Sequence, residues 1–187
     1  PTIGMLGVMK DKSLQMTLDF KYKGDLIYLL GIPKNELNSS EYLANILGVK
    51  NSPAPSFDLE EEFQLQQCIK GLIKNSFINA AHDVSDGGLF TTLVEMALPN
   101  ELGFDIITDS EIRKDAFLFG ESQSRVVVAL QEEDESRFID HINEMGIQGL
   151  LLGHVTKGRC TVDEQNFGMI TDYGDLYNTA IEKEMTQ

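Results

Sequence analysis

The segment His82-Asp-Val-Ser-Asp-Gly-Gly-Leu89 holds the residue types best suited to chemistry in this chain. It lies between a strand-like and a helix-like run, and its two glycines let other groups approach the turn closely. The first amides of a helix carry partial positive charge, which suits an anion such as phosphate. A carboxylate at the strand end, Asp83, could hold Mg²⁺ beside that phosphate. The segment thus predicts an anion or Mg²⁺ site involving Asp83, Ser85, Gly87 and Gly88.

A plainer interpretation of the same segment is a tight turn in which Ser85 or Asp86 caps the following helix. His82 is then a hydrogen-bonded strand residue, although a catalytic base is the alternative. We expect His141 on the exposed side of its helix and His154 in a strand, and neither has a visible nucleophile partner. The sequence therefore assigns no catalytic residue in this chain.

The second polar segment is Phe119-Gly-Glu-Ser-Gln-Ser-Arg125, directly before the apolar run Val126–Leu130. Short polar residues before a buried strand place Glu121, Ser122 and Gln123 at a sheet end, where ligands often bind. The alternative is a polar loop in which Arg125 pairs with a carboxylate. The sequence shows no Ser-His-Asp arrangement, metal-binding cluster, Walker-type loop or dinucleotide fingerprint.

Hydrophobic periodicity and capping residues predict the elements that carry these segments. The predicted helices are Glu41–Leu47, Asp58–Lys74, Leu89–Leu98 and Asp134–Met145. The predicted strands are Thr2–Met9, Gln15–Phe20, Asp25–Leu30, Ile78–Asp83, Phe104–Thr108, Arg125–Leu130, and a final pair, Gly149–Val155 and Arg159–Val162, turned at Lys157-Gly158. Residues 51–56, with two prolines, form the expected linker. Interleaved helices and strands favour a mixed sheet covered by helices.

Bulk composition narrows the function classes. The formal net charge is −15, from 30 acidic and 15 basic residues, and such a surface repels nucleic acid. Two isolated cysteines, Cys68 and Cys160, suggest buried thiols in a reducing compartment. No apolar run approaches the length of a membrane span and no signal peptide is visible. We therefore expect a cytoplasmic protein that binds neither nucleic acid nor a membrane.

The motifs HDVSDGGL and LFGESQSRVVV, in this order, resemble the phosphoribosylformylglycinamidine synthase (FGAM synthase) family. The resemblance extends to PTIGMLG, GDLIYLLG and ELNSSEYL upstream and covers nearly the whole chain. The first motif occurs in looser form throughout the aminoimidazole ribonucleotide (AIR) synthetase superfamily, whereas FGESQSR points to the FGAM synthase branch. Rival interpretations are an AIR or selenophosphate synthetase, or a stand-alone binding or scaffold module.

The resemblance implies a three-layer α+β domain, the C-terminal half of the second of two synthetase repeats. Residues 23–187 match this domain, and residues 1–22 match the end of the preceding domain or a junction strand. The resemblance also implies that residues 1–9 stay outside the domain's own sheet; a hairpin with residues 15–20 is the alternative. Such enzymes use Mg²⁺ and ATP to convert formylglycinamide ribonucleotide and glutamine-derived ammonia to formylglycinamidine ribonucleotide, ADP and phosphate. Their catalytic histidines lie in other domains, so the chain alone is expected to be inactive. Its expected partners are the remaining synthetase domains and a glutaminase domain or subunit.

By motif, Asp83 matches a Mg²⁺ ligand, and Glu121, Ser122 and Gln123 match a substrate-binding segment of the first repeat. In the second repeat, the equivalent site holds an auxiliary nucleotide in some members and is structural or vacant in others. The sequence departs from the family in the segment Glu36–Glu41, which lacks an expected glycine pair. Close backbone approach in that segment is therefore in question.

Overall fold

The computed structural model describes residue 4 and residues 6–185. Within them, the strands are β1 (Leu26–Leu30), β2 (Ala80–Asp83), β3 (Gly103–Ile106), β4 (Val126–Leu130), β5 (Gly149–Thr156), β6 (Arg159–Val162) and β7 (Gln165–Met169). The α-helices are α1 (Leu59–Lys74), α2 (Gly88–Ala97), α3 (Lys114–Phe119), α4 (Glu135–Glu144) and α5 (Ile170–Met185). Short helical turns are η1 (Lys12–Leu14), η2 (Tyr42–Ile46), η3 (Leu98–Asn100) and η4 (Glu132–Asp134).

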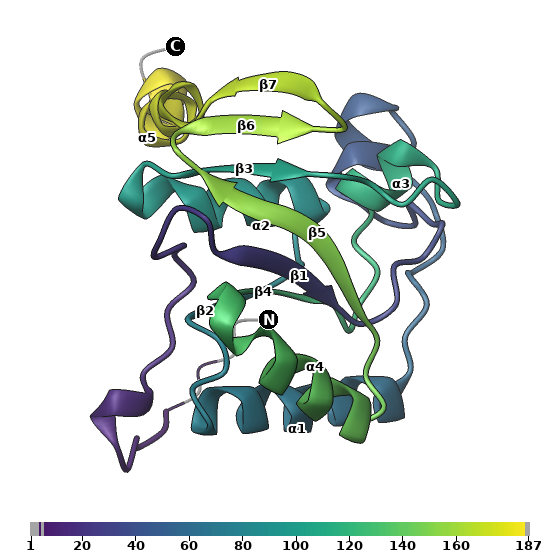
Figure 1. Cartoon of the computed structure of the whole chain (residues 1–187). Coiled ribbons are helices and arrows are strands. Elements are labelled where there is room, and N and C mark those ends of the chain that lie inside the picture. The colour runs from purple at the N-terminus through teal and green to yellow at the C-terminus, as the bar shows by residue number, and fades with distance from the viewer. Residues whose placement is uncertain (1–3, 5, 186–187) are drawn as a thin grey trace.

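The seven strands form one sheet in the order β2-β4-β1-β5-β3-β6-β7 (Figure 1). Neighbouring strands are antiparallel except for β3 and β6, which run parallel. The predicted mixed sheet is confirmed. At its β2 edge, the end of β2 meets the start of β4, with Asp83 opposite Val126.

Helices cover both faces of this sheet, so the predicted three-layer α+β architecture is confirmed. β1 shows the alternation: Ile27 and Leu29 join the core under α2 and α3, whereas Tyr28 and Leu30 join the core under α1 and α4. α1 and α4 lie side by side in Figure 1. Burial on both faces explains the nearly continuous apolar run in this strand.

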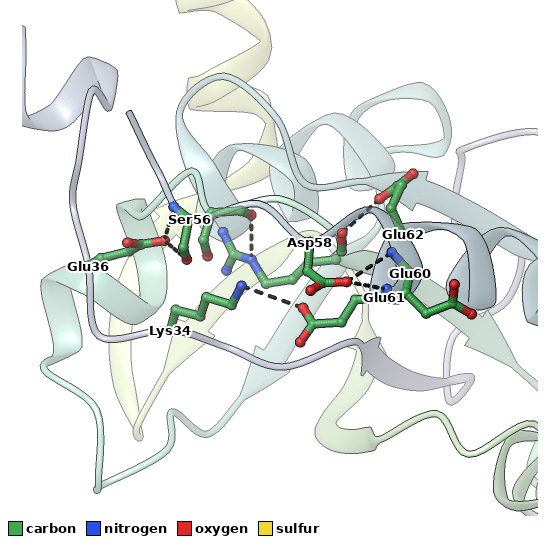
Figure 2. A network of polar contacts seen from close by, with 10 residues as sticks. Lys34, Glu36, Ser56, Asp58, Glu60, Glu61 and Glu62 are labelled. Atoms are coloured by element: carbon green, nitrogen blue, oxygen red, sulfur yellow. Dashed lines mark hydrogen bonds and ion pairs between the residues drawn. The ribbon is translucent and has the colours of Figure 1, made fainter. Parts of the chain in front are cut away.

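The predicted helices form close to their expected bounds. Asp58 caps α1, since its Oδ1 accepts hydrogen bonds from the amides of Glu60 and Glu61 at 2.9 and 3.0 Å (Figure 2). At η2, Ser40 Oγ accepts a hydrogen bond from Leu43 N. Cys68 and Cys160 are buried free thiols, as predicted, and burial raises the pKa of each to about 11.

The predicted strand at residues 15–20 and the predicted pairing of the last two strands are wrong. Residues 15–20 form no strand, because Phe20 is buried in the core and its N–H donates to Met96 O of α2 at 2.9 Å. β5 and β6 do not pair with each other, because β3 lies between them. Gly103 permits this insertion, since a β-carbon there would lie 2.1 Å from Arg159 O. α3, β7 and α5 have no counterpart among the sequence predictions.

Other expectations concern particular residues. His141 is half-buried against α1 instead of lying on an exposed face, because α4 packs across that helix. Of the predicted strand 2–9, residues 2, 3 and 5 lie outside the described residues, and Gly4 and 6–9 form no strand and are exposed. No helix in the described part of the chain is long and apolar enough to cross a membrane.

Candidate functional site

A cleft of about 780 Å³ opens at the β2 edge of the sheet. Its walls are the turn after β2, the loop before β4, one face of α1, and parts of residues 38–57. Because β2 and β4 are antiparallel neighbours, the residues that end β2 and those that precede β4 meet at the same sheet end. The fold thereby joins the two segments that the sequence singled out.

Four of the predicted site residues line this cleft: Asp83, Ser85, Glu121 and Gln123. Gly88 does not line it, because it packs against the end of α3, where an added β-carbon would lie 2.7 Å from Phe119 Cα. Gly87 is also absent from the lining but starts α2 beside it.

Ser122, the remaining predicted site residue, is 1% exposed and does not line the cleft. Its Oγ has no hydrogen-bond partner among the described residues. The structure therefore brings the Asp83 turn and the Glu121–Gln123 segment together but turns Ser122 into the protein.

The start of α2 differs from the sequence prediction that Ser85 or Asp86 caps it. The N-cap residue is Gly87, with a left-handed backbone (φ 81°), and no side chain of its own segment caps the helix. Instead, Glu121 Oε1 accepts the Gly87 N–H at 2.8 Å. The same oxygen accepts the Glu41 N–H at 2.8 Å. The negative charge at this helix N-terminus is thus supplied by the protein itself.

Arg125 holds the loop that carries Glu121. Its side chain is buried, and Nε and Nη2 donate to the carbonyl oxygens of Ser122 and Gly120 at 2.9 and 2.7 Å. Desolvation lowers the pKa of Arg125 to about 10, opposed by attraction to Glu36 and Glu121. Arg125 therefore stays charged at neutral pH. Its hydrogen bonds go to backbone carbonyls rather than to a carboxylate, which corrects the loop interpretation given by the sequence.

Asp83 presents an exposed carboxylate at the end of β2, with 72% of its side chain accessible. His82 lies behind it: Nδ1 is 3.2 Å from Asp83 Oδ1, and Nε2 is 3.0 Å from Glu95 Oε2 of α2. His82 is therefore a partnered strand residue. The arrangement fixes the orientation of Asp83 from one side and leaves the other side toward the cleft.

The cleft is acidic. Four carboxylates (Glu62, Asp83, Asp86, Glu121) line it against two cations, Lys70 and the buried Arg125. Such a balance disfavours a free anion and favours an anion accompanied by a cation. No group of three or more His, Cys, Asp or Glu residues within the described residues could hold a metal ion. An exposed carboxylate such as that of Asp83 is nevertheless the type of oxygen donor that Mg²⁺ prefers.

Sequence reasoning missed the contributions of α1 and of residues 38–57. Glu62 of α1 accepts a hydrogen bond from Ser124 Oγ at 2.8 Å and so ties the helix to the loop before β4. Glu36 Oε1 accepts hydrogen bonds from Ser56 N and Oγ at 3.1 and 2.9 Å, and these bonds hold the two ends of residues 36–56 together (Figure 2). These contacts join segments that are distant in sequence, so no local sequence pattern predicts them.

Phe57 and apolar residues of α1, such as Ile69, also line the cleft. Gly120 supplies the close approach that the segment Glu36–Glu41, without glycines, was expected to lose. A β-carbon at Gly120 would lie 2.7 Å from Glu36 O. The glycine that allows this close approach is therefore Gly120, in the loop before β4, and not a residue of the segment Glu36–Glu41.

Known proteins resemble this chain over most of its length. The family model described as "AIR synthase related protein, C-terminal domain" matches residues 23–163. The phosphoribosylformylglycinamidine synthase subunit PurL of Moorella thermoacetica is 36% identical over 153 residues, which are 82% of this chain and 21% of that protein. The PurL subunit of Carboxydothermus hydrogenoformans is 40% identical over 156 residues, which are 83% of this chain and 21% of that protein. The chain thus spans about a fifth of these relatives.

Solved structures share the fold at low sequence identity. T. maritima PurL complexed with FGAR matches with a TM-score of 0.72 and 16% identity, covering 86% of this chain and 29% of that one. T. maritima PurL complexed with ATP gives a TM-score of 0.65 and 14% identity, covering 86% and 27%. The hydrogenase maturation protein HypE in complex with ATP gives 0.56 and 16%, covering 82% and 53%. The match of the family model to three quarters of the residues decides the assignment: the chain belongs to the family of AIR synthase-related C-terminal domains.

Proposed function

We propose that this chain is the C-terminal domain of the second synthetase repeat of an FGAM synthase, with residues 1–22 at the junction to the preceding domain. The whole enzyme would use ATP to convert formylglycinamide ribonucleotide and ammonia to formylglycinamidine ribonucleotide, ADP and phosphate. Identities of 36–40% to PurL subunits and the order of the sequence motifs support this proposal. Its partners would be the other synthetase domains and a glutaminase domain or subunit, in the cytoplasm.

Within that enzyme, the cleft would form one wall of a nucleotide site. The observation that carries this role is the meeting of Asp83 with the Glu121–Gln123 segment in one cleft. Asp83 would hold Mg²⁺, which neutralises phosphate charge when bound. The hydroxyl of Ser85 and the amide of Gln123 would donate hydrogen bonds to the ligand. The acidic lining supports a ligand that arrives with its cation.

We further propose that the chain alone is inactive. Phosphoryl transfer to the substrate needs ATP, substrate and ammonia held together, and one wall of one cleft cannot arrange all three. The purified chain mixed with formylglycinamide ribonucleotide, Mg²⁺–ATP and ammonia should release ADP at the background rate. Sustained ADP release that depends on the substrate would contradict this part of the proposal.

A domain exchange tests the assignment to FGAM synthase. This chain would replace the 156 matching residues of the C. hydrogenoformans PurL subunit, and growth of a purine auxotroph without added purine would be measured. Growth is expected. The control replaces the same residues with the matching segment of HypE, which shares the fold but has diverged in sequence. If the chimera with this chain is folded and yet supports no more growth than the HypE control, the assignment fails.

The role of Asp83 has its own test. In that growing chimera, Asp83→Asn should lower the nucleotide retained through purification, because an amide oxygen binds Mg²⁺ more weakly than a carboxylate does. Nucleotide would be quantified by chromatography after acid release. Unchanged nucleotide content together with an unchanged Tm would contradict the Mg²⁺-binding role proposed for Asp83.

A further inference from the structure

One carboxylate oxygen at the cleft, Glu121 Oε1, accepts hydrogen bonds from both Glu41 N–H and Gly87 N–H. Glu121 Oε1 receives both amides at 2.8 Å, and the two amides start η2 and α2. Glu121 lies 34 residues after Gly87 and 80 residues after Glu41 along the chain. A single carboxylate oxygen therefore connects three walls of the cleft.

The loop around Glu121 is built to hold that carboxylate in place. Arg125 donates hydrogen bonds to the carbonyl oxygens of Gly120 and Ser122, the two residues on either side of Glu121. The backbone packs closely at Gly120, since an added β-carbon would lie 2.4 Å from Ala116 O. The carboxylate is thus fixed in position before any ligand arrives, as expected for a structural acceptor.

Asp86 lines the same cleft and provides a contrast. It is exposed, and its side chain makes no hydrogen bond or ion pair with any described residue. Both carboxylates carry the same charge toward a ligand, but only Glu121 has an oxygen, Oε1, that accepts two backbone N–H groups. Coordination of a ligand through Oε1 would break both of these charge-assisted hydrogen bonds.

We propose that Glu121 is a positioning residue: its Oε1 clamps the start of η2 to the start of α2 and so sets the shape of the cleft, without touching the ligand. This inference rests on the proposed nucleotide site for its consequence in binding. It replaces the ligand-contact role that the sequence motif implies for this residue. Asp83, Ser85 and Gln123 are then the groups that face the ligand.

Amide hydrogen exchange of the 187-residue chain, followed by NMR, tests the clamp directly. Glu121→Ala should speed exchange of the Glu41 and Gly87 amides by about tenfold or more, because each loses a charge-assisted hydrogen bond. Glu121→Gln keeps an oxygen acceptor and should stay within about threefold of the native rates. Asp86→Asn is the charge-matched control and should leave both amides at native rates. Equal exchange in Glu121→Ala and native chains would overturn the clamp.

Chemical rescue separates positioning from simple loss of stability. Acetate added to the Glu121→Ala chain should slow exchange at Glu41 and Gly87 and leave the amides of the distant strand β7 unaffected. If acetate slows exchange at all amides equally or at none, the two N–H donors do not bind one anion in common and the inference fails.

Binding of Mg²⁺–ADP, measured by calorimetry in the growing chimera, completes the test. A positioning role predicts that Glu121→Gln retains affinity within about threefold, whereas Glu121→Ala loses about tenfold or more. Equal losses in the two variants would mean that the charge itself contacts the cation, against the proposal. If the unmodified chimera binds no Mg²⁺–ADP, the proposed nucleotide site fails, while the exchange data still decide whether Glu121 is a clamp.

Discussion

Gly71 of α1 lies against the imidazole of His141 in α4, so that a β-carbon at residue 71 would stand 2.5 Å from His141 Nε2. The same ring nitrogen lies 3.4 Å from Cys68 O, and the ring packs edge-on to Phe77 with the ring centres 6.1 Å apart. This contact joins the two helices that cover one face of the sheet. A glycine inside a helix is normally unfavourable, and here it allows the imidazole to approach the helix backbone.

Gly71→Ala should therefore lower the free energy of unfolding by about 1 kcal/mol, although alanine is the better helix former. In a His141→Ala background, the same substitution should raise it by about 1 kcal/mol, because only the helix preference remains. Urea unfolding of the four chains gives the coupling between the two residues. A coupling below about 0.5 kcal/mol would show that the ring moves aside without cost.

Gly88→Ala should be far more destabilising than Gly24→Ala. Both glycines have positive φ, 73° and 96°, so both alanine variants carry left-handed strain of roughly 1–2 kcal/mol. Only Gly88 is also crowded by backbone, since its β-carbon would meet Phe119 Cα and Gly120 O, whereas nothing lies within 4 Å at Gly24. The Tm of Gly24→Ala should fall by a few degrees and that of Gly88→Ala by about 10 °C or more. Equal decreases would contradict the tight approach of α2 to α3.

Asp25 should make stability depend on pH. It is 3% exposed, and burial raises its pKa above 3.8, partly offset by hydrogen bonds from Asn79 Nδ2 and Tyr22 N. Because the folded chain holds this proton more tightly than the unfolded chain, the stabilisation is complete below about pH 3.8. It is lost as the pH rises through the raised pKa.

The Asp25→Asn variant removes this titration while an amide oxygen remains to accept both hydrogen bonds. The difference between its Tm and that of the native chain should increase in favour of the variant as the pH rises from about 4 to about 7. Asp86→Asn, at an exposed carboxylate, should follow the native curve. Parallel curves for Asp25→Asn and native protein would show that Asp25 titrates normally.

Truncation tests where the folded unit begins. A chain starting at Asp11 should keep native stability, because the exposed side chains of Leu6 and Val8 make little packing contribution. A chain starting at Lys21 also loses Phe20, which is fully buried, and should be less stable by about 3 kcal/mol or more. Thermal unfolding of both chains decides the matter. Equal stability would mean that residues 11–20 contribute nothing to the stability of the folded domain.

Local patterns by themselves determined most of the elements of this protein. The run Asp25–Leu30 and the run Arg125–Leu130 predicted central strands because side chains on both faces of each strand are apolar. The cap at Asp58 and the apolar stripe after it predicted α1 for similarly local reasons. The motif residues Asp83 and Glu121 could also be placed at strand ends from sequence alone.

Only the tertiary structure decided which contacts those motif residues make. Sequence could not show that β3 inserts between β5 and β6, since strand pairing depends on long-range contacts and not on the alternation within each strand. Nor could it show that Glu121, 34 residues after Gly87, supplies the acceptor that Ser85 and Asp86 were expected to supply. A helix N-terminus needs an acceptor, but any segment that folds against it can provide one. The sequence therefore identifies the need, and the packing of α2 against the loop before β4 selects the residue that meets it.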